Sequence, residues 1–219
     1  MTREPEAQGD ALLQRLLGDV GDHGELANDL LREFAHGYPV QRLRQLLRSS
    51  KSETAKSGAW IASELGRKFR PLLTELPAML GHSEVFVRYF AIDAVLVCCD
   101  PEHNDLIAQV LSMWSDESSA VRAKVFDFVT RASVEQLRAA LDHMESSEVG
   151  GFAMGLRRVV EHPDRIRVRE ELRDVNPLVR RLALAAAVRS RKQDLVRLAA
   201  QSDDPEIKKL AEGVLNSGW

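Results

Sequence analysis

Aromatic residues and cysteines are scarce in this chain. Of its 219 residues only 5% are aromatic and two are cysteines, whereas 44% are hydrophobic and 29% are charged. This balance is typical of a folded domain and excludes an intrinsically disordered chain. With few aromatics and much Leu, Ala, Val and Arg, the composition favours helices that pack through small and aliphatic side chains. Cys98 and Cys99 are adjacent and lie in an apolar run, so we expect buried thiols and no bridge between them.

Long apolar segments are also missing. No apolar run approaches the ~18–20 residues that a bilayer-spanning helix needs. The first ten residues are polar and acidic, without the apolar stretch of a secretory signal. We therefore expect a cytoplasmic protein that does not contact the membrane.

Motifs for catalysis or cofactor binding are absent as well. The six histidines are scattered, no two are spaced i, i+4, and there is no Cys-x-x-Cys, so we expect no metal site. The glycine-rich residues 150–155 lack the preceding strand and the Gly-Lys-Ser/Thr ending of a phosphate loop, and close helix packing explains them better. No nucleophile motif such as Gly-x-Ser-x-Gly occurs. The sequence thus predicts a protein that is not an enzyme and holds no cofactor.

What the chain does contain is a pattern that recurs about every 30 residues. A β-branched residue is followed by a base, and small or apolar residues stand three and six positions after the base. The base position falls at residues 24, 56, 88, 122, 150, 180 and 208, although 24 and 150 are glycines and position 55 is Ala rather than β-branched. Such a period is typical of solenoids built from helix pairs.

Each copy is predicted to be the second helix of an antiparallel pair. Prolines after Asn176 and Asp204 mark helix starts, and no strand alternation occurs. The intervening first helices are expected in the amphipathic stretches 40–47, 69–80, 106–114, 134–144, 165–172 and 195–199. The fold class predicted is all-α: a right-handed α-solenoid of about seven helix pairs, with 12–14 helices. We expect one domain over 1–219, with repeats in 24–216 and an N-terminal cap in 1–22.

The copy around Arg180 carries a fuller motif, Asp-x-x-Pro-x-Val-Arg-x-x-Ala-x-x-Ala. This motif resembles the second half of HEAT repeats. The resemblance implies the HEAT solenoid fold and a ladder of Asp and Arg between neighbouring repeats, which Asp116/Arg122 and Asp174/Arg180 match. The ladder is broken where His82 replaces Asp and where residue 150 is Gly. More loosely, residues 37–66 resemble bacterial stand-alone HEAT proteins of toxin–immunity gene neighbourhoods.

Helical geometry predicts which residues face a partner. With the base as position zero, positions −1, 3 and 6 are core, whereas positions 1, 5 and 8 point away from it. The latter are expected on the concave inner face, bordered by Trp60 and Phe126; they are Ser57, Ile61, Glu64, Tyr89, Asp93, Leu96, Ala123, Asp127, Thr130, Arg158 and Arg181. Aromatics beside acids resemble interface hot spots, so the predicted partner-binding residues are Trp60, Glu64, Tyr89, Asp93 and Asp127. The alternatives are that Trp60 and Tyr89 pack between repeats and that the acids form a solvated stripe.

The charge distribution favours a protein partner. Residues 37–70 and 157–197 are net positive and the other segments are net negative, for a total of −3. An acidic middle third suits a basic partner, and the looser resemblance implies an immunity protein that neutralises a bacterial toxin, such as a basic nuclease.

Two enzymatic alternatives remain. One is a HEAT-like DNA-repair glycosylase acting on alkylated bases, which needs a basic groove. The Arg-rich residues 157–197 favour it, but Asp93 and Asp127 stand where bases are expected, so nucleic acid is not the partner we expect. The other is a lyase-like HEAT protein acting on a protein-bound cofactor, which no residue supports specifically.

Overall fold

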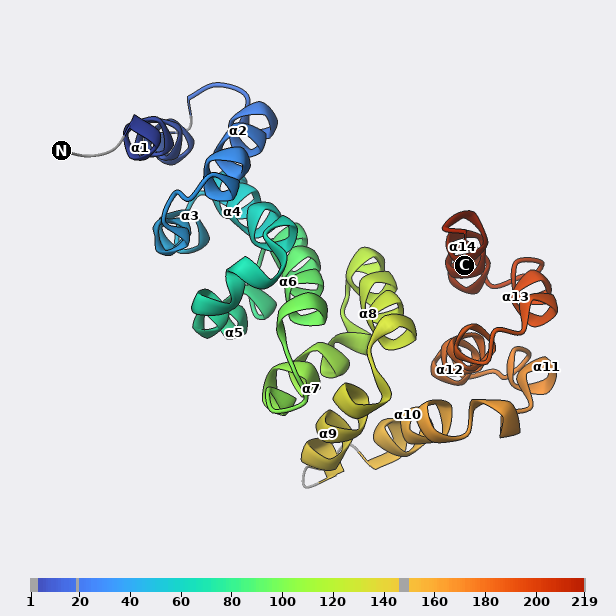
Figure 1. The fold of residues 1–219 in the computed structure, drawn as a ribbon. Helices are drawn as coiled ribbons and strands as arrows, with labels where there is room; N and C mark the ends of the chain where they lie inside the picture. Colours follow the sequence, from blue (N-terminus) through green and yellow to red (C-terminus); the bar gives the residue numbers. More distant parts are fainter. Residues whose placement is uncertain (1–3, 19, 146–149, 219) are drawn as a thin grey trace. The chain divides into compact units, whose positions relative to one another are not determined.

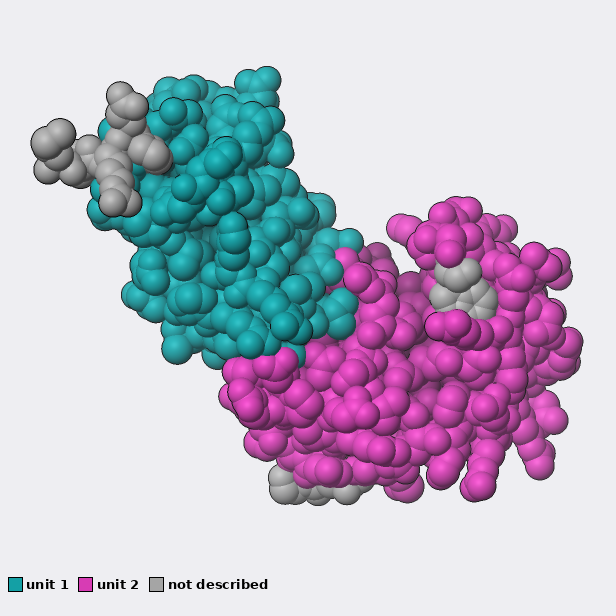
Figure 2. Space-filling view, in the orientation of Figure 1, with its two compact units in different colours: residues 1–99 teal, residues 100–219 magenta. Residues whose placement is uncertain are grey.

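A computed structural model describes residues 4–18, 20–145 and 150–218. Throughout these residues the secondary structure is helical, with 14 α-helices, four 3₁₀ segments and no strand. The chain divides into two compact units, Met1–Cys99 (unit 1) and Asp100–Trp219 (unit 2), shown in Figure 2. The predicted all-α class is confirmed.

Unit 1 is built from two layers of helices (Figure 1). Its elements are α1 (Glu4–Gly18), α2 (His23–Ala35), η1 (Val40–Leu43), α3 (Arg44–Leu47), α4 (Ser52–Glu64), η2 (Gly66–Glu75), α5 (Leu76–Leu80) and α6 (Val85–Cys98). Helices α2, α4 and α6 form one layer, with α4 packed between the other two. Helices α1 and α3 and the η2–α5 segment pack behind them. The second helices expected around positions 24, 56 and 88 are therefore α2, α4 and α6.

In α4 of unit 1, the positions predicted to face the core are buried. Ala55, Ala59 and Ala62 of α4 are at most 1% exposed, because they stand at positions −1, 3 and 6 of the pattern. The small side chains let α3 approach α4 closely: a Cβ on Gly58 would lie 2.8 Å from the Cβ of Leu46. Small residues in this copy therefore set the distance between the two layers.

Unit 2 contains the remaining helices. They are α7 (Asn104–Ser112), η3 (Met113–Ser115), α8 (Ser119–Arg131), α9 (Val134–Glu145), α10 (Gly150–Glu161), η4 (Pro163–Arg165), α11 (Val168–Glu171), α12 (Pro177–Arg189), α13 (Gln193–Ala199) and α14 (Pro205–Asn216). The copies at positions 122, 150, 180 and 208 lie in α8, α10, α12 and α14. Val149, the first residue of the second of these copies, lies outside the described residues.

Helix α12 is the centre of unit 2. It packs against α8, α10, α11, α13 and α14. Eight consecutive residues, 181–188, are buried, so the helix has no solvent face over two turns. The run Leu-Ala-Leu-Ala-Ala-Ala-Val explains this, since a helix that is apolar on all sides is stable only when surrounded.

Arginines at the base position fasten the turn before their own helix. Arg122 Nη1 donates to the Asp116 carbonyl oxygen (2.8 Å), and Arg180 Nη1 donates to the Asp174 carbonyl oxygen (2.6 Å). Arg88 Nη1 makes the same bond to the His82 carbonyl oxygen (2.8 Å). This bond needs only a main-chain oxygen, so the His82 copy keeps the contact although it lacks the aspartate.

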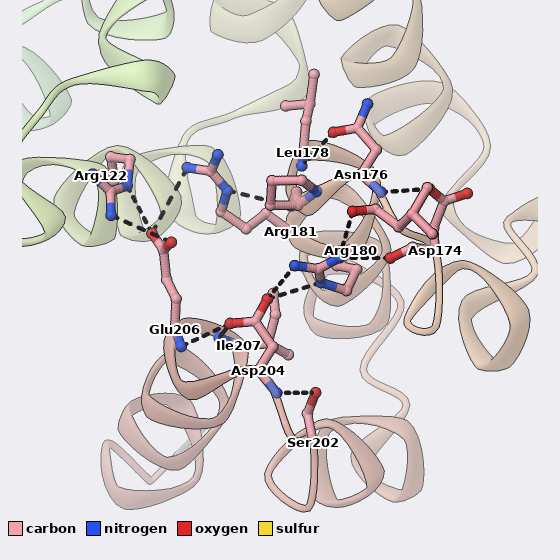
Figure 3. A network of polar contacts seen from close by, with 12 residues as sticks. Arg122, Asp174, Asn176, Leu178, Arg180, Arg181, Ser202, Asp204, Glu206 and Ile207 are labelled. Atoms are coloured by element: carbon pink, nitrogen blue, oxygen red, sulfur yellow. Dashed lines mark hydrogen bonds and ion pairs between the residues drawn. The ribbon is translucent and has the colours of Figure 1, made fainter.

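Two acids at the start of α14 link arginines of α8 and α12 (Figure 3). Asp204 pairs with Arg180 (2.6 Å) and caps α14 by accepting from the Glu206 amide (2.9 Å). Glu206 pairs with Arg122 of α8 (2.8 Å), and Arg181 approaches it to 3.8 Å. The charged pairs of unit 2 therefore join α8, α12 and α14.

Three residues expected on the inner face are buried instead. Ser57, Ile61 and Arg181 are 7%, 0% and 7% exposed, so those predictions were wrong. Ser57 and Ile61 stand on α4, which is flanked by α2 on one side and α6 on the other. Arg181 donates through Nη1 to the Trp114 carbonyl oxygen (2.8 Å), with its guanidinium carbon 5.7 Å from the centre of that indole ring.

Candidate functional site

A pocket of about 470 Å³ opens on the α2–α4–α6 layer of unit 1. Trp60 of α4 and Phe86 and Phe90 of α6 form its aromatic wall, and His23 of α2 lies at its polar edge. The volume falls in the range of ligand pockets, roughly 300–1,000 Å³. The surface it offers is mainly apolar.

The aromatic residues of α6 form a cluster beside this pocket. Tyr89 and Phe90 stack edge to face, with ring centroids 5.5 Å apart at 89°. Phe86 lies 6.4 Å from Tyr89 and 6.5 Å from Phe90, measured between ring centroids. Phe86 is 48% exposed. A large aromatic side chain is therefore left half in water beside an apolar pocket.

Hydrogen bonds hold the polar edge of the pocket in place. The Ser57 hydroxyl donates to the Glu53 carbonyl oxygen (2.9 Å) and lies 3.1 Å from His23 Nδ1. Lys56 forms an ion pair with the Glu53 carboxylate (2.5 Å). The His23–Ser57 contact joins α2 to α4, whereas the other two interactions lie within α4.

Four of the five predicted partner-binding residues lie on the adjacent helices α4 and α6. Trp60 is half-buried in the pocket wall, and Glu64 follows one turn later, exposed at the end of α4. Tyr89 and Asp93 are both half-buried and share one face of α6, because they are spaced i, i+4. Two carboxylates therefore stand one turn beyond the aromatic residues on adjacent helices.

The fifth residue, Asp127, lies in unit 2 on α8. Its carboxylate pairs with Arg131 (3.1 Å) and Lys124 (3.6 Å) of the same helix. It lines a different cavity, of about 520 Å³, between α8 and α14. Its local environment thus differs from that of the α4–α6 residues.

Sequence reasoning missed Phe86, Phe90 and His23. Phe86 and Phe90 stand at positions −2 and 2 of the repeat, which the register assigned to neither the core nor the inner face. Their i, i+4 spacing on one helix face was the available signal.

Other kinds of site have little support in the described part of the chain. No group of three or more His, Cys, Asp or Glu residues there could hold a metal ion. The Cys98 thiol is buried beside the Gly66 carbonyl oxygen (3.1 Å), and burial raises its pKa to about 11, which keeps the sulfur protonated and unreactive. No helix among these residues is both long and apolar enough to cross a bilayer.

Comparisons with known proteins assign no family. No family model and no curated protein matches the chain. A crystal structure of an engineered protein from the Northeast Structural Genomics Consortium aligns over 100% of this chain and 94% of its own, with 14% identity and a TM-score of 0.46.

Proposed function

We propose that this protein is a binding module for another protein and that the partner docks on the Trp60 surface. This surface comprises Trp60, Glu64, Phe86, Tyr89, Phe90 and Asp93. The observation that carries the proposal is the half-exposed Phe86 in an aromatic cluster beside a 470 Å³ pocket.

The aromatic residues are expected to supply most of the affinity. Tyr and Trp are enriched at interface hot spots, where truncating one side chain costs ~2 kcal/mol or more. Trp60 and Tyr89 are half-buried already, so part of each side chain is immobilised before a partner arrives. Because α4 is packed between α2 and α6, little backbone ordering accompanies binding.

The carboxylates decide which partner fits. Glu64 adds an exposed carboxylate one turn beyond Trp60, and Lys56 and Glu53 neutralise one another in the pocket lining. A partner with a large apolar anchor flanked by Lys or Arg would match both features, and opposite charges would speed its association.

Two features of the sequence support a more specific fold and function. The repeat motif supports a right-handed HEAT-type solenoid, with the Trp60 surface on its inner face. The likeness of residues 37–66 to HEAT proteins of toxin–immunity neighbourhoods supports a cytoplasmic immunity protein that neutralises a basic bacterial toxin. The basic flanks expected of the partner agree with such a toxin.

Selection from a random peptide library tests the binding surface with the chain alone. We expect the peptides enriched on the wild-type protein to combine a large apolar residue with Lys or Arg. The double variant Trp60→Ala/Phe86→Ala should bind them at least about 30-fold more weakly, since that factor corresponds to ~2 kcal/mol.

Val175→Ala is the matched control, because Val175 is an apolar residue of unit 2 that is 95% exposed. Thermal melts of all variants check that the fold persists. Enriched peptides that bind the double variant as tightly as the wild type would remove the Trp60 surface from the proposal.

A further inference from the structure

Helix α12 ends in a Schellman motif with an arginine at the left-handed position. The Lys192 amide donates to the Ala187 carbonyl oxygen (2.9 Å), and the Arg191 amide donates to that of Val188 (3.0 Å). This pattern places Arg191 at φ 53°, and among the described residues it is the single non-glycine with positive φ. A side chain with a Cβ is sterically unfavourable in this region, so glycine is the usual residue here.

Helix α2 provides the internal comparison. The Tyr38 amide donates to the Glu33 carbonyl oxygen (2.9 Å) and the Gly37 amide to that of Phe34 (3.3 Å), which is the same motif. Gly37 occupies the left-handed position there, at φ 104°. The chain therefore uses glycine for this turn in unit 1 and an arginine in unit 2. A residue that opposes its own backbone conformation points to a role for the side chain.

The Arg191 side chain lines a pocket of about 580 Å³ within unit 2, which we name the Arg189 pocket. Its wall is made by Thr130 and Ala132 at the end of α8, by Val188 and Arg189 at the end of α12, and by Arg191 and Gln193 after it. No carboxylate is among these described lining residues. The pocket is large enough for a small organic molecule.

Arg189 is positioned but not neutralised. Its Nη1 donates to the carbonyl oxygens of Val129 (2.7 Å) and Ala132 (3.1 Å). Within the described part of the chain, no carboxylate pairs with Arg189 or Arg191, and Nε and Nη2 of Arg189 make no hydrogen bond. Burial lowers the pKa of Arg189, and two carbonyl oxygens rather than a carboxylate face its positive charge.

The carbonyl bonds alone would explain a capping role for Arg189 at the end of α8. They leave two of its three guanidinium nitrogens unused, and they do not explain Arg191. An anion in the pocket would accept hydrogen bonds both from these nitrogens of Arg189 and from Arg191. Guanidinium forks match tetrahedral oxyanions through paired hydrogen bonds, and the Gln193 side-chain amide offers a further donor.

We propose that the Arg189 pocket binds a doubly charged phosphate group of a small molecule, a phosphate monoester or a pyrophosphate. Arg189 and the exposed Arg191 line the pocket with no carboxylate among its lining residues, so two positive charges there match two negative charges on the ligand. This site is separate from the Trp60 surface and does not depend on the function proposed for unit 1.

Titration calorimetry with inorganic pyrophosphate tests the site, using the full chain at about 0.15 M ionic strength, where the Debye length is about 8 Å. We expect saturable binding with one pyrophosphate per chain. Arg191→Gly should weaken it about tenfold or more, as expected for losing a charge-assisted hydrogen-bond donor. The same variant should melt no lower than the wild type, because glycine suits the turn. A purely structural role for Arg191 predicts no change in binding.

Arg197→Gln is the matched control, since it removes an exposed arginine of α13 outside the pocket lining. It should leave binding within about twofold of wild type, as expected for a screened surface charge. Absence of saturable binding, equal weakening by Arg197→Gln, or unchanged binding to Arg191→Gly would each overturn the proposal. A duplex oligonucleotide that binds through Arg191 where pyrophosphate does not would overturn it too, in favour of a nucleic-acid backbone.

Discussion

The packing of α3 on α4 leads to a prediction that reverses the usual effect of a substitution. Replacing glycine by alanine inside a helix normally stabilises it by about 1 kcal/mol. Gly58 stands in the interior of α4, so helix propensity alone predicts that Gly58→Ala is stabilising.

The geometry at Gly58 opposes that gain. A Cβ there would lie 2.8 Å from the Cβ of Leu46 and 3.1 Å from the Leu47 amide nitrogen. Carbon atoms pack favourably at about 3.5–4.0 Å, so α3 and α4 would have to separate by roughly 0.5–1 Å. Leu46 is 0% exposed, so its neighbours also have to move. Overpacking of this kind costs ~1–3 kcal/mol, which exceeds the propensity gain, and we expect a net loss of about 1 kcal/mol.

Gly213 of α14 is the matched control, because a Cβ on it would meet nothing within 4 Å. Gly213→Ala should therefore stabilise by up to about 1 kcal/mol. Urea unfolding followed by circular dichroism gives both free energies of unfolding. Equal urea midpoints for Gly58→Ala and Gly213→Ala would contradict this prediction, since α3 would then not lie against α4 at this distance.

Three further predictions concern buried groups. Ala183→Leu should lower the free energy of unfolding by ~1–3 kcal/mol, because Ala183 is 0% exposed at the centre of unit 2. In the same urea assay, Ala11→Leu on the exposed face of α1 should change the free energy of unfolding little. Glu75 should make unit 1 acid-sensitive, because hydrogen bonds from Arg48 hold the pKa of its carboxyl below the ordinary value. Its contribution to the free energy of unfolding is complete above about pH 4.3 and is lost as the pH falls through the folded-state pKa. Glu75→Gln should therefore flatten the loss of stability measured below pH 4.3. Cys98 should resist a disulfide reagent at pH 8 until denaturant exposes it, because burial of the thiol and its raised pKa, about 11, suppress the thiolate. Rapid labelling of Cys98 in the native protein, located by mass spectrometry, would contradict this prediction.

Local signals in the sequence were enough to locate most helices. The base position of the pattern fell inside or at the start of α2, α4, α6, α8, α10, α12 and α14, because small or apolar residues three and six positions later bury one face. The short first helices were less regular than expected. Pro71 interrupts the predicted helix 69–80, so η2 has non-helical backbone at Leu72 (φ −116°) before α5 begins.

Long-range packing was beyond the reach of periodicity. Nothing local indicates that α12 also packs against α8, so Arg181 was expected to be accessible when it is in fact buried beneath Trp114. Within the candidate site, helical geometry placed Trp60, Glu64, Tyr89 and Asp93 on neighbouring helices. It did not identify Phe86, because an exposed phenylalanine violates the burial rule from which the register was derived.

Site-specific photo-crosslinking in the native cells tests most directly whether the Trp60 surface binds a protein. A photoreactive phenylalanine analogue is placed at Phe86, which is 48% exposed, or at Val175, which is 95% exposed in unit 2. We predict that the Phe86 position crosslinks to one protein with Lys or Arg beside an apolar anchor, and that Trp60→Ala abolishes the crosslink. The Val175 position should give no such product. A crosslink to the same protein from Val175 but not from Phe86, or one from Phe86 that survives Trp60→Ala, would contradict the account.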